Sequence, residues 1–223
     1  MIYRGVPISS LPQGRYKAGL LDPPWKFLAR SAKGLGKSPD RHYQTMTIDQ
    51  LKALPVRGLF AKDAIIFVWV IDTHLELALE CIEAWGFVYK TVGFYWAKTT
   101  QDGKGFPIGT GFWTRANPEH AYECITVEQE VERCLLATSG APKRQNAGVP
   151  RLLVSPRREH SRKPDETAAR IEALVDGPYL EMFSRTDREG WDSWGDEAGN
   201  FAIQQRLHTQ KVLLGDPMAA ALI

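Results

Sequence analysis

The chain has 223 residues, of which 43% are hydrophobic and 24% are charged, so we expect one globular domain with a sizeable core. The net charge of +2 excludes a strongly basic protein, so any nucleic-acid surface has to be local. The three cysteines lack metal-ligand spacing and the longest apolar run is too short to span a bilayer. We therefore predict a cytoplasmic protein without a metal site or a membrane segment.

The first predicted strand covers residues 16–21 and ends directly before the tetrapeptide Asp-Pro-Pro-Trp, Asp22 to Trp25. Pro23 and Pro24 lack N–H groups and stiffen the segment, which leaves their carbonyl groups free to accept hydrogen bonds. The Asp22 carboxylate only accepts. One carboxylate oxygen and one proline carbonyl can thus hold both N–H groups of an aromatic amine, such as the 6-amino group of adenine, while Trp25 stacks on the base. The alternative is a proline-rich turn beside a buried tryptophan.

Basic residues follow this motif. Residues 26–41 include Lys26, Arg30 and three further cations around two glycines, which is typical of a loop that follows a phosphate backbone. A second basic run covers residues 157–163. Together the two segments predict nucleic-acid contacts that the low net charge conceals. The alternative is that both are solvated surface loops.

Strands and helices alternate through the rest of the chain. We predict helices that begin at a capping box at 47–50, at residue 73 and at Pro164, and that end at residues 54, 85 and 175. We predict strands over residues 64–71, 87–98, 134–138, 151–154 and 179–185, of which the first is an apolar run typical of a strand buried on both faces. This alternation predicts an α/β fold with helices on both faces of a mixed, mostly parallel sheet. Ligands then bind outside the carboxyl ends of the strands.

An ordered series of short motifs resembles the MT-A-seventy family of adenine 6-amino methyltransferases, typified by the catalytic subunit of the mRNA-methylating complex. The matching motifs are DPPW at 22–25, HYQTM at 42–46, FVWV at 67–70, WGF at 85–87, WAK at 96–98, GTGFWTRANPE at 109–119, EHSRKPDE at 159–166, LEMFSR at 180–185 and WDSWG at 191–195. Each motif alone is weak, whereas the series is specific and covers about residues 16–197. The resemblance implies a Rossmann-like fold, a permuted motif order in which the catalytic loop comes first, and S-adenosylmethionine as methyl donor.

The resemblance also implies roles for single positions. Asp22 with Pro23 or Pro24 holds the target amine, Tyr43 is an aromatic gate near the incoming base, and Lys163 holds the methionine end of the cofactor beside Asp22. The other implied cofactor contacts are Glu181, Arg185, Asp196 and Glu197, where Asp196 replaces the usual asparagine of the family. From the residues alone, Glu181 is equally consistent with a solvent-facing strand position and Lys163 with a solvated basic run.

Two segments depart from the family pattern. Residues 121–133 are predicted as an acidic insertion that either extends a strand or forms a hairpin. Residues 199–223 are predicted as a C-terminal extension of a methyltransferase domain over residues 1–198.

The predicted function is transfer of a methyl group from S-adenosylmethionine to the 6-amino group of adenine in nucleic acid. DNA is favoured over RNA, because a short chain without RNA-binding appendages resembles the bacterial and phage members. The alternative is a non-catalytic nucleic-acid-binding subunit or a pseudo-methyltransferase of a larger complex. Whether the chain forms a homodimer or a heterodimer stays open.

Overall fold

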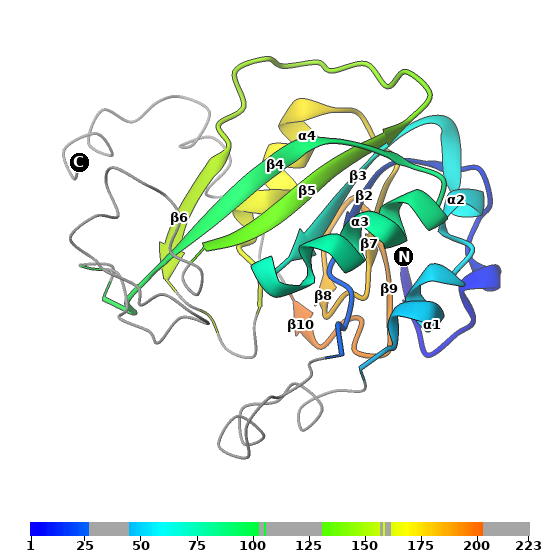
Figure 1. Cartoon of the computed structure of the whole chain (residues 1–223), viewed down its shortest axis with the longest axis horizontal. Helices are drawn as coiled ribbons and strands as arrows, with labels where there is room; N and C mark the ends of the chain where they lie inside the picture. Colours follow the sequence, from blue (N-terminus) through cyan, green and yellow to red (C-terminus); the bar gives the residue numbers. More distant parts are fainter. Residues whose placement is uncertain (27–44, 103–104, 106–130, 157, 159–161, 203–223) are drawn as a thin grey trace.

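An eight-stranded mixed sheet forms the centre of the molecule (Figure 1). The computed structural model describes residues 1–26, 45–102, 105, 131–156, 158 and 162–202. The strand order is β1-β9-β7-β2-β3-β5-β4-β6. The strands are β1 (Ile2–Arg4), β2 (Tyr16–Leu21), β3 (Phe60–Val70), β4 (Val88–Thr99), β5 (Val131–Ser139), β6 (Leu152–Pro156), β7 (Tyr179–Met182) and β9 (Trp191–Gly195).

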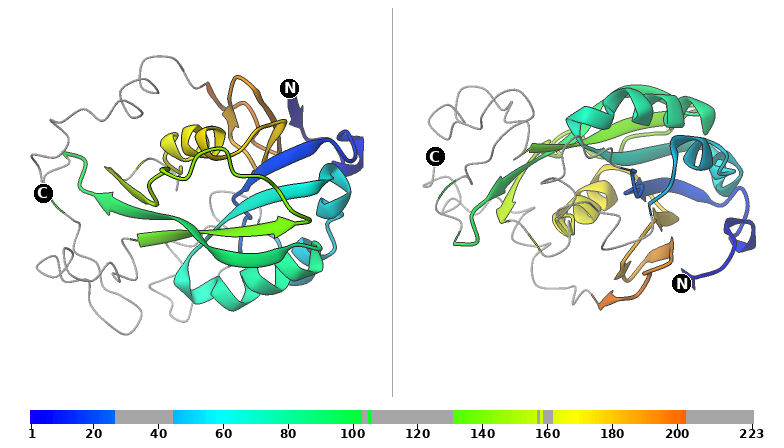
Figure 2. Two further views of the ribbon diagram at one scale, coloured as in Figure 1. Left: turned by 90° about the horizontal axis from the view of Figure 1, so that it is seen from above. Right: turned by 60° about the horizontal axis from the view of Figure 1, so that its bottom comes forward.

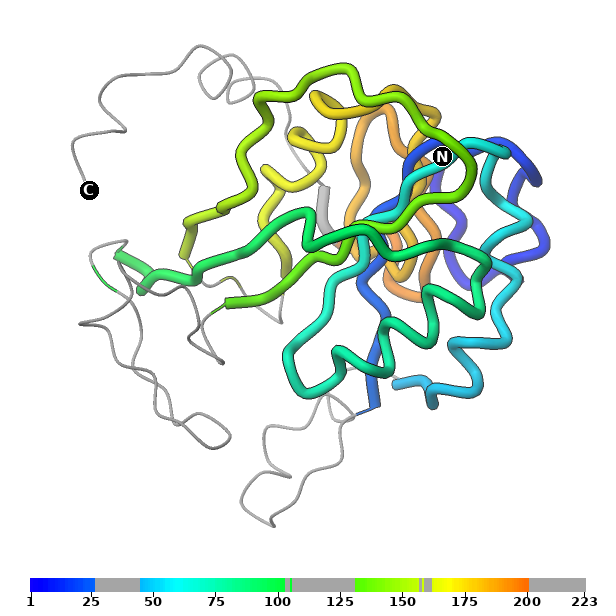
Figure 3. The backbone as a smooth tube through the Cα atoms, turned by 45° about the horizontal axis from the view of Figure 1, so that its top comes forward, coloured from blue at the N-terminus to red at the C-terminus, as the bar shows by residue number. Residues whose placement is uncertain are grey.

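The neighbouring strands pair in parallel except where β5 lies between β3 and β4, because both of its pairings are antiparallel. Two short strands, β8 (Thr186–Asp187) and β10 (Phe201–Ala202), form a separate parallel pair. Figure 3 shows the N-terminal β1 beside β9, which is nearly 190 residues away in sequence. The predicted α/β, Rossmann-like fold with a mixed, mostly parallel sheet is confirmed.

Helices cover both faces of the sheet, as predicted (Figure 2). The helices α1 (Ile48–Lys52), α2 (Val56–Leu59) and α3 (Leu75–Ala84) pack with one core cluster, and α4 (Glu166–Leu174) packs with the other. Short 3-10 helices cover Ile8–Ser10 (η1) and Asp72–His74 (η4). Alternate residues of β3 enter the two clusters, with Ile66 and Val68 in the first and Phe67 and Trp69 in the second. The prediction of a strand buried on both faces is therefore confirmed.

Local signals explain where several elements begin and end. The capping box is present, since the Thr47 side chain accepts from Gln50 N and the Gln50 side chain accepts from Thr47 N. Gly86 ends α3 with a φ of +75°, a conformation that favours glycine. The strand predicted over residues 179–185 is too long: it stops at Met182, because Phe183 has a φ of +59° and turns the chain out of the sheet.

Candidate active site

Asp22 lies at the carboxyl edge of the sheet, directly after β2. Its backbone N–H donates to the carbonyl of Met182 at the end of the adjacent β7. Its carboxylate Oδ2 accepts from Lys163 Nζ at 2.9 Å, and Lys163 follows it by 141 residues. The structure therefore brings together the two residues that the sequence motifs placed beside the cofactor.

Glu132 joins this pair and was missed by the sequence analysis. Its Oε2 lies 3.2 Å from Lys163 Nζ and its Oε1 lies 2.5 Å from Lys98 Nζ near the end of β4. The four side chains form a row of alternating charge: Lys98, Glu132, Lys163 and Asp22. Because these contacts are buried or half-buried, the attraction between neighbours is screened less than on an open surface.

The row keeps Glu132 and Lys163 ionised. Burial alone would raise the pKa of Glu132, but the ammonium groups of Lys163 and Lys98 lower it to about 2. Burial alone would lower the pKa of Lys163, but the carboxylates of Asp22 and Glu132 raise it above its usual value. A cation therefore stands beside Asp22 at any physiological pH.

The position of Glu132 decides between the two alternatives for the end of the predicted insertion. Val131, Glu132 and Arg133 belong to β5, where they pair with Ala97, Trp96 and Tyr95 of β4. Of the two alternatives for this segment, these residues extend a strand. The apolar-polar alternation that continues to Val131 was the available signal. The remainder, residues 121–130, lies outside the described residues.

The proline carbonyls are not free, which corrects the expectation from the motif. The carbonyl of Pro23 accepts from Trp25 N at 2.8 Å in a tight turn. The carbonyl of Pro24 accepts from Met46 N at 2.9 Å. A carbonyl oxygen has two lone pairs, so each can accept one further hydrogen bond from an amine.

Trp25 has a packing role in the structure, so the expectation that it stacks on the base is wrong. Its side chain is 7% exposed and belongs to the core cluster beneath α1 and α3. The indole Nε1–H donates to the carbonyl of Trp69 at 3.2 Å. A cavity of about 190 Å³ lies beside this ring, lined also by Met46, Leu51 and His74, and Asp22 does not contribute to it. The ring anchors the motif to β3 through its hydrogen bond to the Trp69 carbonyl.

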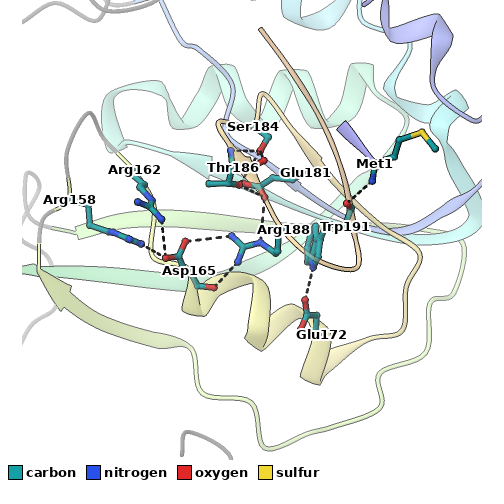
Figure 4. Close-up of polar contacts among 10 residues, drawn as sticks. All are labelled: Met1, Arg158, Arg162, Asp165, Glu172, Glu181, Ser184, Thr186, Arg188 and Trp191. Atoms are coloured by element: carbon teal, nitrogen blue, oxygen red, sulfur yellow. Dashed lines mark hydrogen bonds and ion pairs between the residues drawn. The ribbon is translucent and has the colours of Figure 1, made fainter. Parts of the chain in front are cut away.

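A second group of charges lies at the ends of β7 and β9 (Figure 4). The carboxylate of Glu181 on β7 accepts from Thr186 Oγ1 at 2.9 Å and lies 3.6 Å from Arg188 Nε. Burial raises the pKa of Glu181, and the guanidinium of Arg188 partly offsets this shift. Arg188 is a further residue that the sequence analysis did not select.

The remaining predicted cofactor residues lie close by. Arg185 Nε is 3.8 Å from Glu197 Oε2, because β7 and β9 are adjacent and parallel and end at the same edge. Asp196 is exposed, and its backbone carbonyl accepts from Arg4 Nε at 3.1 Å. Carboxylates, guanidinium groups and an ammonium group thus line one edge of the sheet, the usual ligand edge of such folds.

This edge and its motif order agree with a family comparison. A family model described as MT-A70 matches residues 16–197, most of the chain and the same span as the motifs. The chain belongs to the MT-A70 family. It is therefore a member of a family of methyltransferases whose named relatives include N(6)-adenosine-methyltransferases.

Relatives of two sizes match this MT-A70 chain. A protein of Medicago truncatula described as a putative N(6)-adenosine-methyltransferase MT-A70-like is 32% identical, over 82% of the chain and 26% of the relative. The human N(6)-adenosine-methyltransferase catalytic subunit METTL3 is 29% identical, over 77% of the chain and 26% of the relative. The type II methyltransferase M.MunI of Mycoplasma sp is 26% identical, over 87% of the chain and 82% of the relative. The chain spans about a quarter of the length of the plant relatives it matches.

Only some of the residues predicted to contact the substrate lie in the part of the chain that the structure describes. Lys26 is exposed directly after the MT-A70 motif, and its backbone carbonyl lies 3.3 Å from His74 Nε2. Tyr43 and Arg30 lie outside the described residues, as does most of the second basic run.

In the described part of the chain, no group of three His, Cys, Asp or Glu side chains is placed to hold a metal ion. No described helix is both long and apolar enough to cross a bilayer.

Proposed function

We propose that this protein transfers a methyl group from S-adenosylmethionine to the 6-amino group of adenine in nucleic acid, with DNA preferred over RNA. The observation that carries the proposal is the contact between Lys163 and the Asp22 carboxylate at the end of β2. It joins two distant family motifs at the sheet edge where ligands of this fold class bind.

The side chains at this edge fit S-adenosylmethionine, which carries a carboxylate, an ammonium group and a ribose diol. Lys163 and Arg185 offer cations to the carboxylate. Glu181, of which the side chain is 14% exposed, offers acceptor oxygens to the ammonium group or to the hydroxyl groups, and Glu197 offers a second carboxylate. When bound, the cofactor supplies an electrophilic methyl group on a sulfonium centre. The exposed position of Asp196 makes its contact with the cofactor the weakest of the five that we propose.

Asp22 orients the amine. Lys163 occupies Oδ2, and Oδ1 has no hydrogen-bond partner among the described residues, so Oδ1 can accept one N–H of the adenine amine. The second lone pair of the Pro23 or Pro24 carbonyl accepts the other. Two acceptors on the amino hydrogens favour a pyramidal nitrogen with its lone pair available for attack. After transfer, Asp22 Oδ1 can accept the proton that the nitrogen loses.

The choice of nucleic acid rests on length. One relative, the type II methyltransferase, is matched over 87% of the chain and 82% of its own length, whereas the N(6)-adenosine-methyltransferases are matched over about a quarter of theirs. This match supports DNA, and an adenine in duplex DNA has to leave the base stack to reach Asp22. We propose that the exposed Lys26 and the segment that follows it, including Arg30 and Tyr43, contact the nucleic acid.

The test is transfer of labelled methyl groups from S-adenosylmethionine to single-stranded DNA, duplex DNA and RNA of one sequence at a fixed salt concentration. We expect label on adenine N6, most of it in DNA, and loss of transfer in Asp22→Ala. The matched control is Asp49→Ala, which removes an exposed carboxylate from the first turn of α1 and should leave transfer unchanged. Binding of an oligonucleotide without transfer to any substrate would instead indicate a non-catalytic binding subunit.

A further inference from the structure

Arg188 connects two parts of the proposed cofactor site. It lies between β8 and β9 and is 3% exposed. Its Nε is 3.6 Å from Glu181 Oε2 on β7, and its Nη2 is 3.7 Å from Asp165 Oδ1 at the start of α4. Its Nη1 also donates to the backbone carbonyl of Asp165 at 3.5 Å. Figure 4 shows the guanidinium between the two carboxylates.

Asp165 in turn fixes the segment that carries Lys163. Although Asp165 occupies the N-cap position of α4, its side chain makes no capping hydrogen bond. Its Oδ2 instead accepts from Arg158 at 2.6 Å and from Arg162 at 3.3 Å. Since Lys163 lies two residues before Asp165, a contact that holds Asp165 also restricts the approach of Lys163 to Asp22.

The charges around Glu181 make Arg188 electrostatically important as well. Thr186 from β8 donates a hydrogen bond to the Glu181 carboxylate. The like charge of Asp22 at the end of β2 raises the pKa of Glu181. Its register neighbours in the sheet, Leu20 and Ser193, are uncharged. Among the described residues, Arg188 is the cation that forms an ion pair with Glu181. Without it, burial and the charge of Asp22 would act on Glu181 with little opposition.

We propose that Arg188 is a positioning residue for the cofactor, because its guanidinium ties the Lys163-bearing segment to Glu181 and favours the carboxylate form of Glu181. The inference rests on the proposed function, in which Lys163 and Glu181 hold S-adenosylmethionine. It predicts that the affinity for the cofactor depends more steeply on pH when Arg188 is neutralised, because a protonated Glu181 no longer accepts from the cofactor.

The test is calorimetric binding of S-adenosylhomocysteine to the full chain between about pH 5.5 and 7.5, a range in which an unperturbed carboxyl stays ionised. For the wild type we expect an affinity that changes less over this range than that of Arg188→Gln. For Arg188→Gln we expect weaker binding that falls up to about tenfold per pH unit on acidification, since only the ionised fraction binds. Arg188→Lys keeps the charge and should restore the wild-type profile. The double variant Arg188→Gln/Glu181→Gln should bind weakly at every pH.

The matched control is Arg158→Gln, which removes a cation from the same Asp165 carboxylate but has no contact with Glu181 among the interactions of the described residues. Its pH profile should match that of the wild type. Thermal unfolding of each variant separates loss of binding from loss of fold. A wild-type pH profile and wild-type affinity in folded Arg188→Gln would overturn the inference and leave the proposed function intact. Absence of binding by the wild type would overturn the proposed cofactor instead.

Discussion

Glu132 and Glu181 are both carboxylates in covered positions at the same sheet edge, yet their surroundings act on them in opposite directions. Glu132 lies between two lysines at 2.5 and 3.2 Å, and its pKa is lowered to about 2. Glu181 has one guanidinium at 3.6 Å and a like charge from Asp22, and its pKa is raised. Distance and the number of cations account for the difference, because burial raises the pKa of both groups.

The comparison separates two kinds of charged site. The closely paired row from Lys98 to Asp22 is self-neutralised and holds its geometry before any ligand arrives. The looser group around Glu181 and Arg188 keeps ion pairs beyond hydrogen-bond length, so a zwitterionic ligand can complete it. Asp22 is a member of the first group, and its charge raises the pKa of Glu181 in the second group.

Changing Asp22 should give the largest effect. Asp22→Asn keeps an acceptor oxygen but removes the charge that Lys163 contacts, so we expect the rate of methyl transfer to fall about 10³-fold, or about 4 kcal/mol. The measurement is single-turnover transfer to the preferred oligonucleotide. Binding of S-adenosylhomocysteine should change less than about tenfold, because Lys163 and Glu181 remain. Full activity in Asp22→Asn would refute its role as the amine acceptor.

Removing Glu132 tests the closely paired row. Glu132→Gln leaves Lys98 and Lys163 facing each other without the carboxylate between them. We expect a loss of about 3 kcal/mol in the free energy of unfolding, measured with urea, because one partner of a buried pair is removed. The matched control is Lys52→Met, which breaks the exposed pair of Lys52 with Glu80 and should change stability little. Equal effects of the two substitutions would show that the row is not held by its charges.

Acidification should change the contributions of Glu132 and Glu181 to the stability of the folded protein in opposite directions. The folded-state pKa of Glu132 lies below its unfolded value, so its stabilising effect is present above about pH 4.5 and is lost as the pH falls toward about 2. The stability difference between wild type and Glu132→Gln should therefore shrink over this range. The difference between wild type and Glu181→Gln should move the other way, since the raised pKa makes the folded protein take up that proton first. Parallel pH profiles for the two differences would contradict the comparison.

Substitution of Trp25 should have the smallest effect. It distinguishes packing of the ring in the core from stacking of the ring on the base. Trp25→Phe removes the Nε1–H bond to Trp69 and part of the ring, so we expect a loss of about 2 kcal/mol in stability. The Michaelis constant for the oligonucleotide should stay unchanged. Trp194→Phe removes a similar bond, from Trp194 to the Val6 carbonyl, at a half-buried position, and should cost less. A raised Michaelis constant with unchanged stability would restore the stacking role.

Much of the fold was predictable because its signals are local. The apolar run that becomes β3, the Thr47 capping box and Gly86 at the end of α3 each depend on a few neighbouring residues. The motif order also identified Asp22 and Lys163, which the structure brings within 2.9 Å.

The missed residues depend on information that no local pattern contains. Glu132 meets Lys163 because β5 inserts antiparallel between β3 and β4, and strand order cannot be read from periodicity. Arg188 follows a short strand in a polar stretch typical of a solvated turn, and its burial comes from β7 and α4. Trp25 was assigned to the substrate because the motif is at the ligand edge, whereas helices far along the chain bury its ring.

The central claim is that Asp22 lies beside the reacting sulfur, and a crystal structure of the full chain with S-adenosylhomocysteine tests it most directly. We predict the sulfur next to the Asp22 carboxylate, with the amino-acid end of the ligand between Lys163 and Glu181. Binding at another place, or an Asp22 side chain turned away from the bound sulfur, would contradict the account.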